Sequence, residues 1–338
     1  MLPRALIVSV AAALAACGSS STTPSAPATG APAGSDPLFT APNAWTQPVD
    51  AASLHPQSAS MIAQLVSLGG FGLGRFQVDF SMVVLEASAT TPSATFVPSP
   101  GYYRPDCDTV ASIPLPAGGA IEGQPGYACD VSANDCHLIV IDRSAARLHE
   151  VYQATVDASG VVHGQCAIAW TLSTSYPADM RGDQCTSADA AGLPIAPLLF
   201  SADEIAAGSI DHAIRFILPN SRIRAGVFVH PASHAGAPSG PASTVPYGAR
   251  LRLRADFPVA SLPAPAQVVA RALQRYGMIL ADGGNVALTA RDDRFTVHKW
   301  TEVGFDSRSL QAITAADFQV VDHAAPIALT YDCVRNGR

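Results

Sequence analysis

Imidazole, carboxylate and guanidinium groups lie close together at two places in the second half of the chain. Residues 211–216 read Asp-His-Ala-Ile-Arg-Phe, and on a strand this pattern places His212 and Arg215 on opposite faces. Residues 230–234 read His-Pro-Ala-Ser-His, where the proline and the missing glutamate exclude the helical zinc-hydrolase motif. A histidine such as His212 or His234 transfers protons near pH 7 if it reaches a substrate. Otherwise it is a hydrogen-bonded core residue.

Asp189 and Glu150 add acid–base candidates, and Asp142 adds a possible substrate contact. Asp189 lies among small residues in the segment 186–194, directly after Cys185, so a disulfide at Cys185 would hold this loop rigidly. The alternative role for Asp189 is an Asx-turn or a helix cap. Asp142 and Arg143 end an apolar strand and Glu150 lies on the next, so pairing of these strands would bring the three to one cleft. The alternative is an exposed ion pair at a strand end.

Further charged residues suggest ligand contacts. Asp282 begins the Asp-Gly-Gly-Asn tip of an expected hairpin, where it serves either the turn or a ligand. Arginines alternate along 250–254, with two more at 222 and 224. They could hold the carboxylates or sulfates of an anionic glycan by bidentate contacts, or form the solvated face of an edge strand.

Several function classes are excluded. The sequence has no Gly-x-Ser-x-Gly elbow, phosphate-binding loop or dinucleotide-binding fingerprint. It has no Cys-x-x-Cys pair, and its cysteine spacings are irregular for zinc. The net charge of −7 argues against a general nucleic-acid binder, which needs a basic surface. We therefore predict no cofactor, no metal site and no nucleic-acid partner.

The elements that must position these residues are mainly strands. Alternating or short apolar runs predict strands near 76–82, 137–142, 148–156, 161–172, 212–218, 225–229 and 250–257, and a hairpin over 278–289. Helices are expected at 264–276, at 58–68 and after the capping box Ser201–Glu204. This pattern predicts an all-β fold, either a β-sandwich or two jelly-roll-like halves, with two or three short helices.

The cysteines indicate an exported protein. Of seven cysteines, Cys17 stands in the N-terminal segment, which leaves an even set suited to a disulfide framework in an oxidising compartment. Fifteen pairings of six cysteines are conceivable. Proximity in the sequence favours Cys129–Cys136 and Cys166–Cys185, which leaves Cys107–Cys333.

The N-terminus has the layout of an export signal. Arg4 precedes an apolar run of about ten residues, too short to span the roughly 30 Å hydrocarbon layer, and small residues lead to Cys17. Leu14-Ala-Ala-Cys17 resembles the lipobox of bacterial lipoproteins, in which the cysteine is lipidated and becomes the new N-terminus. In the lipoproteins of double-membrane bacteria, Gly18 favours the outer membrane. The alternative is an ordinary signal peptide with a coincidental cysteine.

The predicted domain organisation follows from this. Residues 1–16 form a lipoprotein signal peptide, 17–42 a Ser/Thr/Pro/Ala-rich tether, and 43–338 a β-rich globular domain. The expected partners are the membrane, through lipid on Cys17, and a polysaccharide ligand. The expected location is outside the cytoplasm, lipid-anchored at the outer membrane or cell surface.

Four longer motifs stand out: TSADAAGLPI (186–195), DHAIRFILP (211–219), RLRLRADF (250–257) and ALQRYGMILADGGN (272–285). These motifs resemble a family of exported bacterial proteins, with some eukaryotic relatives, for which the resemblance implies no activity. The resemblance covers about 43–322. It also includes Glu122-Gly123, Asp142-Arg143, Glu150 and His234, and it departs from the family at Cys185 and His230, where the family carries tryptophan.

The hypothesis for function is a surface lipoprotein that acts on or binds extracellular polysaccharide. If it is an enzyme, it is a cofactor-free glycosidase or polysaccharide lyase. The expected catalytic residues are Asp189, His212, His234 and Glu150, and the expected substrate contacts are Asp142, Arg143, Arg215 and Asp282. The alternative is a noncatalytic envelope or adhesion lipoprotein whose polar clusters are structural.

Overall fold

The computed structural model describes residues 38–337. The chain divides into two units, 1–32 and 33–338, and every described residue belongs to the second. Strands in several sheets dominate, with four short α-helices, so the predicted β-rich fold with few helices is confirmed. The predicted signal peptide, Cys17 and most of the predicted tether lie outside the described residues. No helix within 38–337 is long and apolar enough to cross a membrane.

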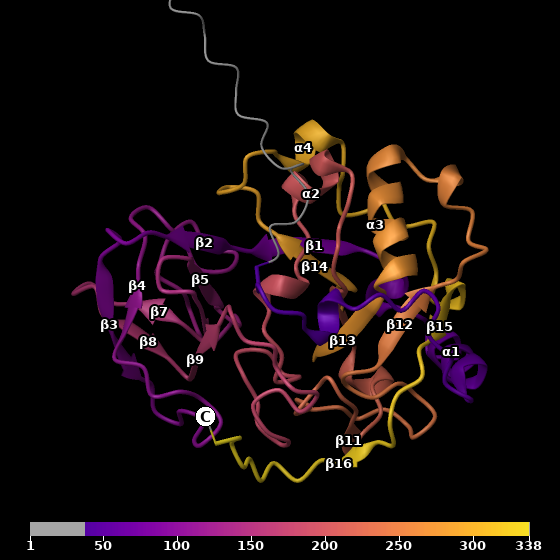
Figure 1. The fold of residues 1–338 in the computed structure, drawn as a ribbon, viewed down its shortest axis with the longest axis horizontal. Helices are drawn as coiled ribbons and strands as arrows, with labels where there is room; N and C mark the ends of the chain where they lie inside the picture. The colour runs from indigo at the N-terminus through magenta and orange to yellow at the C-terminus, as the bar shows by residue number, and fades with distance from the viewer. Residues whose placement is uncertain (1–37, 338) are drawn as a thin grey trace, which may run out of the picture. The chain divides into compact units, whose positions relative to one another are not determined.

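The largest sheet has six strands in the order β1-β14-β10-β13-β12-β15. Figure 1 labels β1, β14, β13, β12 and β15 of this sheet. Their bounds are Val78–Met82, Leu288–Arg291, Ile214–Leu218, Met278–Gly283, Arg250–Leu253 and Phe318–Val320. β10 lies between β13 and β14, parallel to the first and antiparallel to the second. The expected 278–289 hairpin is therefore wrong. Its two strands exist, but β10 separates them because its apolar residues are buried in the centre of the sheet.

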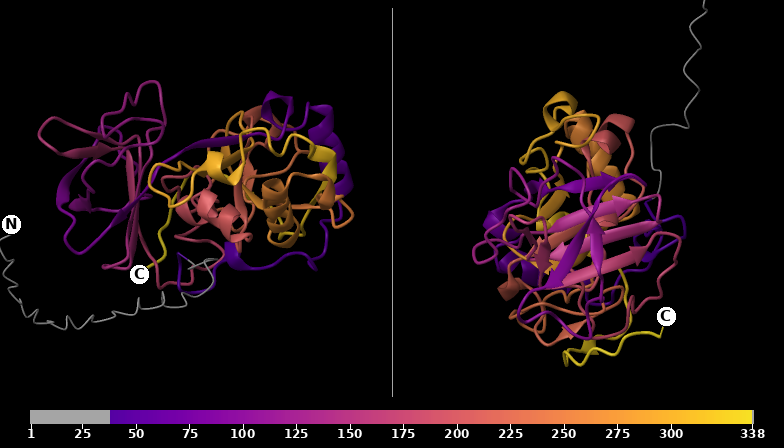
Figure 2. Two further views of the ribbon diagram at one scale, coloured as in Figure 1. Left: turned by 90° about the horizontal axis from the view of Figure 1, so that it is seen from above. Right: turned by 90° about the vertical axis from the view of Figure 1, so that its left-hand side faces the viewer.

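Two smaller sheets pack face to face as a sandwich. One has the order β2-β5-β6-β9, with bounds Val84–Ala87, Leu138–Asp142, Arg147–Tyr152 and Cys166–Thr171. The other has the order β4-β3-β8-β7, with bounds Ser112–Pro114, Ser93–Pro98, Val162–Gly164 and Thr155–Val156. Figure 2 shows these strands apart from the helices.

The strand β5 is buried on both faces, and this explains its continuous apolar sequence. Leu138 and Val140 belong to the core inside the sandwich, whereas Ile139 and Ile141 belong to the main core shared with the six-stranded sheet. Successive side chains of a strand point to opposite faces, so a strand between two cores needs apolar residues at every position.

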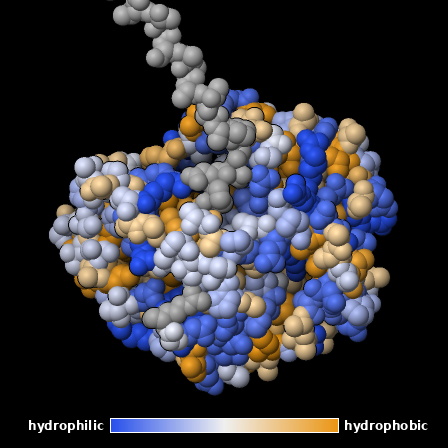
Figure 3. Space-filling view, viewed as in Figure 1, coloured by the Kyte–Doolittle hydropathy of each residue, from blue (hydrophilic) through white to orange (hydrophobic). Residues whose placement is uncertain are grey.

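The helices lie mainly beside the six-stranded sheet. α1 (Ser58–Ser67) packs against β15, and α3 (Ala264–Arg275) packs against β12. α2 (Ala202–Ala207) has the predicted capping box, in which Glu204 and Ser201 bond each other's backbone N–H groups. α4 (Trp300–Val303) was not expected. On the face shown in Figure 3, hydrophilic and hydrophobic residues are interspersed.

The C-terminal segment, residues 324–337, runs along the molecule as a strap with little regular structure. Its one strand, β16 (Ile327–Ala328), pairs with β11 (Val227–Phe228). Gln184 holds the strap by donating to the Ala328 carbonyl and accepting from Thr330 N–H. This strap therefore returns the end of the chain to the loop that begins at Cys185.

Three disulfides join the six cysteines of the domain and indicate an oxidising compartment. Cys129–Cys136 is confirmed. The other two predicted pairs are wrong, because Cys107 bonds Cys166 and Cys185 bonds Cys333. Segment 103–108 runs beside β9, with Asp108 N–H donating to the Ala167 carbonyl, and the strap brings Cys333 to Cys185. Tertiary neighbours, not sequence distance, decide these pairs.

Ordered packing begins before the predicted domain boundary at Asn43. Phe39 is buried and packs edge-to-face on Trp45, so the last residues assigned to the tether already belong to the core. Two arginines of β12 hold the segment that follows, residues 44–52, against the sheet. Arg250 donates to the Ala44 and Gln47 carbonyls, and Arg252 donates to the Val49, Asp50 and Ala52 carbonyls.

Candidate functional site

One cavity of about 650 Å³ gathers part of the predicted site, and we call it the tyrosine pocket. Its ionisable and aromatic lining residues are Tyr103, Arg104, Asp106, Asp135, His137, Tyr152, Asp189, His234, Asp282 and Tyr331. Asp189, His234 and Asp282 were predicted from the sequence, and Arg215 lies buried behind two of them. The segments that build the pocket are far apart in the sequence.

The loop that carries Asp189 is buried along almost its whole length, which is unusual for a loop. Its polar groups are satisfied internally, since Ser187 Oγ donates to the Leu193 carbonyl at 2.7 Å and accepts from Asp189 N–H at 3.0 Å. Gly192 has a φ of +74°, and a Cβ there would lie 2.1 Å from Ser233 Oγ. The loop is therefore a fixed support for Asp189.

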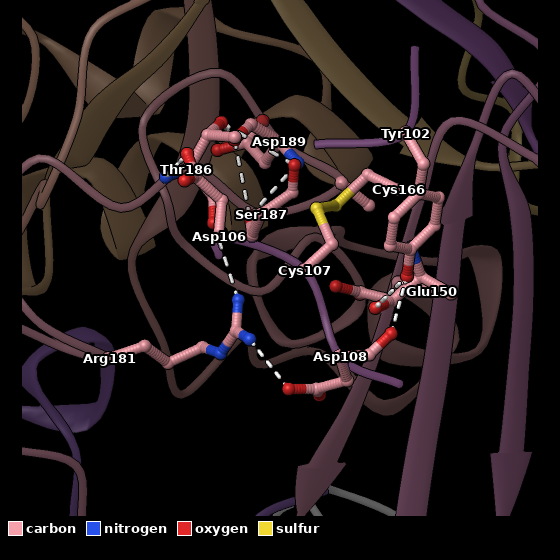
Figure 4. The surroundings of a disulfide bond; sticks show 12 residues. Tyr102, Asp106, Cys107, Asp108, Glu150, Cys166, Arg181, Thr186, Ser187 and Asp189 are labelled. Atoms are coloured by element: carbon pink, nitrogen blue, oxygen red, sulfur yellow. Dashed lines mark hydrogen bonds and ion pairs between the residues drawn. A yellow bond between two sulfur atoms is a disulfide. The ribbon is translucent and has the colours of Figure 1, made fainter. Parts of the chain in front are cut away.

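Contacts with segment 103–108 and with Arg181 hold the loop in place. Thr186 N–H donates to Asp106 Oδ1 at 3.2 Å, next to the Cys107–Cys166 bridge (Figure 4). Arg181 donates to the Thr186 carbonyl and to Asp108. A disulfide at Cys185 does hold the start of this loop. The predicted partner, Cys166, is wrong, because Cys185 bonds Cys333 of the strap.

Arg215 joins the two principal carboxylates of the pocket. Its Nε and Nη2 donate to Asp189 Oδ1 at 3.0 and 2.7 Å, and Nη2 also donates to Asp282 Oδ2 at 2.7 Å. A β-bulge places Asp282 opposite Ile217, on the same sheet face as Arg215. Arg215 is 1% exposed, so this is a buried ion triad and not a surface pair.

Asp189 is the most unusual group in the pocket. Its Oδ1 takes both bonds from Arg215, whereas its Oδ2 is buried with no hydrogen-bond partner among the described residues. Burial raises the pKa of this carboxyl, and the nearby Asp282 adds to the rise, while Arg215 opposes it. A buried carboxylate oxygen without a donor is unfavourable, so Oδ2 is the atom that takes up a proton.

A buried histidine–carboxylate pair lies beside this loop, and sequence reasoning missed it. His137 Nδ1 bonds Glu122 Oε2 at 2.7 Å, and its Nε2 bonds the Ala188 carbonyl at 3.0 Å. Since both nitrogens face acceptors, both carry hydrogen and the ring is an imidazolium. Burial alone would lower the pKa of His137, but Glu122 raises it to about 9. This cation anchors the residue before Asp189.

His234 has the opposite state. Its Nδ1 lies 2.8 Å from the Ala190 carbonyl, so Nδ1 carries the hydrogen and Nε2 is left with a lone pair. Burial lowers the pKa of His234, which favours the neutral ring. His234 therefore can accept a proton or a hydrogen bond. His230, the other histidine of the segment 230–234, pairs with Asp183 at 2.8 Å and does not line the pocket.

Three tyrosines form much of the rim and were also missed. Tyr103 and Tyr152 stack with ring centroids 6.3 Å apart, and Tyr331 of the strap packs edge-to-face on His234. For the His137–Glu122 pair, the sequence gave one signal, the family match at Glu122-Gly123. The tyrosines carried no such signal, because they come from separate segments joined only by the fold.

Two other predicted residues lie in a different cavity. His212 and Arg143 line a second pocket of about 320 Å³, apart from Asp189. His212 is fully engaged there, with Nε2 at 3.0 Å from Glu204 and Nδ1 at 2.8 Å from the Ala213 carbonyl. Arg143 lies 3.5 Å from Glu86. The structure therefore does not bring His212 and Arg143 into one site with Asp189, as the sequence had predicted.

The structure also removes Glu150 and Asp142 from the site. Glu150 is 0% exposed and accepts bonds from Trp170 Nε1 and from the Ile195 and Ala196 N–H groups at 2.8–2.9 Å. Asp142 Oδ1 accepts hydrogen bonds from Ser144 Oγ and from the Ala145 N–H group within its own turn. Although β5 and β6 pair as expected, Glu150 lies opposite Ile139, so Asp142 is at the other end.

The arginine row is structural as well. Arg250 and Arg252 bond backbone carbonyls of 44–52, Arg222 bonds those of Gly70 and Phe71, and Arg254 pairs with Asp256. These guanidinium groups hold chain segments together, which argues against an anionic glycan lying along β12.

Within residues 38–337 no group of three or more His, Cys, Asp or Glu side chains is arranged to hold a metal ion. Comparisons with protein-family models, with curated proteins and with solved structures found no match. The functional argument therefore depends on the geometry of the tyrosine pocket.

Proposed function

We propose that the tyrosine pocket binds an extracellular glycan and cleaves a glycosidic bond by acid–base chemistry. The observation that carries this proposal is Asp189, a buried carboxyl whose Oδ2 has no internal partner and whose pKa is raised. A carboxylic acid that stays protonated toward neutral pH is what protonation of a leaving oxygen requires.

Asp282 is the partner carboxylate in this mechanism. Its Oδ2 and Asp189 Oδ1 each lie 2.7 Å from the same Arg215 nitrogen, so these oxygens are at most twice that distance, about 5.4 Å, apart. This separation is shorter than the roughly 6.5–9.5 Å of inverting glycosidases, so it favours a retaining mechanism. The Asp189 side chain is closed to solvent in this structure, so it would turn Oδ2 toward the glycosidic oxygen when the glycan binds. Asp189 would then protonate that oxygen while Asp282 forms an ester with the anomeric carbon. Water would then break that ester, giving its proton to Asp189 and its hydroxyl to the sugar.

The walls suit a sugar chain. Tyrosine rings offer apolar faces for sugar C–H groups together with a polar hydroxyl, and Tyr103, Tyr152 and Tyr331 surround the carboxylates. The neutral His234 adds an acceptor for a sugar hydroxyl. The pocket volume, about 650 Å³, is within the range of small-ligand sites.

The test is release of reducing sugar ends from neutral, amino and acidic polysaccharides by the purified full-length protein. We expect release from at least one, abolished in Asp189→Asn and retained in Asp50→Asn. Asp50 is an exposed aspartate that does not line the pocket, so it controls for the lost charge. If no substrate is cleaved, the enzymatic proposal fails.

A noncatalytic glycan-binding or adhesion lipoprotein is the second candidate. It is favoured by Arg215, which holds both carboxylates in a buried triad of the kind that also serves a purely structural role. Binding of an oligosaccharide without any release of reducing ends, equal in the wild type and in Asp189→Asn, would support this candidate.

We further propose that Cys17 carries lipid and holds the protein at the outer membrane. The support is the sequence layout around Cys17, together with disulfides that suit an extracytoplasmic location. Expression of Cys17→Ser in a double-membrane bacterium should move the protein from the detergent-extracted membrane fraction to the soluble one. Retention of the variant in the membrane would contradict the anchor.

A further inference from the structure

The tyrosine pocket has an excess of negative charge that internal contacts leave uncompensated. The buried cations His137 and Arg215 already face Glu122 and the Asp189–Asp282 pair, respectively. At the rim, Asp106 and Asp135 face Arg104, and Asp135 also faces the His137 imidazolium, which already pairs with Glu122. Fixed charge of one sign in a hollow raises the local concentration of the opposite charge.

Asp135 is the carboxylate with the fewest commitments. It lies on the exposed turn closed by Cys129–Cys136, and its side chain makes no hydrogen bond or ion pair within residues 38–337. Burial raises its pKa, and the nearby carboxylates Asp282 and Glu122 add to the rise, while His137 and Arg215 oppose it. Asp135 thus faces charges of both signs, and a bound cation would relieve the repulsion that comes from the two carboxylates.

Aromatic rings lie beside this carboxylate. Tyr152 stacks with Tyr103 and lies close enough to Asp135 for the two to interact electrostatically. An ammonium group between a carboxylate and a tyrosine face gains from both. The unpartnered Asp189 Oδ2 is an independent sign that the pocket is arranged for a polar ligand, since buried oxygens are otherwise hydrogen-bonded.

We infer that this pocket selects glycan units carrying a protonated amino group, with Asp135 as the residue that recognises the amine. This inference rests on the proposed function and narrows its substrate class to glycans of free hexosamines. Acidic glycans are disfavoured, because they would meet Asp135, Asp106 and Asp282 with Arg104 as the one lining arginine.

The experiment compares three hexasaccharides that differ in charge. Glucosamine, N-acetylglucosamine and galacturonate hexamers are titrated at pH 5.5 into the full-length protein, and binding is followed within seconds by intrinsic fluorescence. We expect the glucosamine hexamer to bind about tenfold more tightly than the N-acetyl hexamer, with a preference that weakens at high salt.

Two variants locate the effect. Asp135→Asn should remove most of the preference for the amine, measured as the ratio of the affinities for the glucosamine and N-acetyl hexamers. Asp50→Asn changes the net charge equally but should keep the preference. Thermal melting of each variant checks that it is folded.

Each outcome separates this inference from the proposed function. Equal binding of the amine and N-acetyl hexamers, or tighter binding of galacturonate, overturns the inference and leaves the glycan site standing. A preference that survives Asp135→Asn overturns the role of Asp135 and therefore the inference as stated. Binding of none of the three, together with no cleavage of any polysaccharide, overturns both.

Discussion

The tyrosine pocket and the second pocket have similar lining residues and differ in how these residues are used. Both contain histidine, carboxylates and arginine. In the second pocket His212 has partners at both ring nitrogens, and Glu204 serves the cap of α2 as well as His212. In the tyrosine pocket Asp189 Oδ2 lacks a partner, His234 keeps a free lone pair, and the Asp135 side chain makes no hydrogen bond or ion pair within the described residues.

This difference teaches which polar clusters can bind a ligand. Side chains that satisfy one another stabilise the fold and have little left to offer a substrate. Groups held rigidly without a full set of partners are arranged for something that binds later. Four predictions test the comparison.

The largest expected effect is on stability, at the centre of the tyrosine pocket. Arg215→Met leaves Asp189 and Asp282 without their shared cation, and we expect the free energy of unfolding to fall by about 3–5 kcal/mol. Urea unfolding with the disulfides intact measures it. Arg254→Met, which breaks an exposed pair, should show no measurable change. Equal effects of the two variants would mean that the triad is unimportant.

Catalysis should separate the two cavities. Asp189→Asn removes the proton donor, so the initial rate of reducing-end release should fall by about 100-fold or more. The matched change in the second pocket is Glu204→Gln, which should keep the wild-type rate. A comparable loss in both variants would contradict the assignment of chemistry to the tyrosine pocket.

The pH dependence of stability reports on His137 and Glu122. The pKa of His137 is raised from 6.5 to about 9, so the stabilisation by its imidazolium is complete below pH 6.5 and is lost as pH rises through 9. The pKa of Glu122 is lowered from 4.5 to about 2, so its contribution is present above pH 4.5 and is lost as pH falls through 2.

The measurement is urea unfolding between pH 5 and 9.5. The wild type should lose about 3 kcal/mol more than Glu122→Gln over this range, because only the wild type keeps the raised pKa of His137. Parallel curves for the two proteins would show that His137 is not held as a cation. Taking the difference between them also removes the separate titration of Glu150, whose pKa burial raises to about 7.

The smallest effect is expected in the second pocket. Glu204→Ala removes the capping box of α2 and the partner of His212, and should lower the free energy of unfolding by about 1 kcal/mol. Thermal melting measures this, and glycan binding should not change. A loss of binding would mean that the second pocket contributes to the ligand site.

Part of the fold could be predicted because it is written in local patterns. The period of two in Leu251 and Leu253, the apolar run of β5 and the capping box Ser201–Glu204 all gave the elements found. The pairing of elements could not be predicted. The residues of β13 and β14 have a turn sequence between them, yet β10 enters between the two strands.

The candidate site was predicted in the same partial way. Asp189, Asp282, Arg215 and His234 were chosen for their chemistry, and the structure brings them together. Glu150 and His212 were chosen on the same grounds, but internal hydrogen bonds use them. Tyr152, Asp135 and His137 were missed, because a single side chain carries no sign of which distant segment it will face.

The sequence alone determined what each segment prefers: strands where apolar residues alternate, helices where caps begin them, and six cysteines suited to bridges outside the cytoplasm. The tertiary structure decided which cysteines form disulfides, which strands are neighbours and which carboxylate oxygen is left without a hydrogen-bond donor. The physical reason is one of range. Backbone preference and amphipathic period act over a few residues, whereas burial and hydrogen-bond partners depend on contacts between distant parts of the chain.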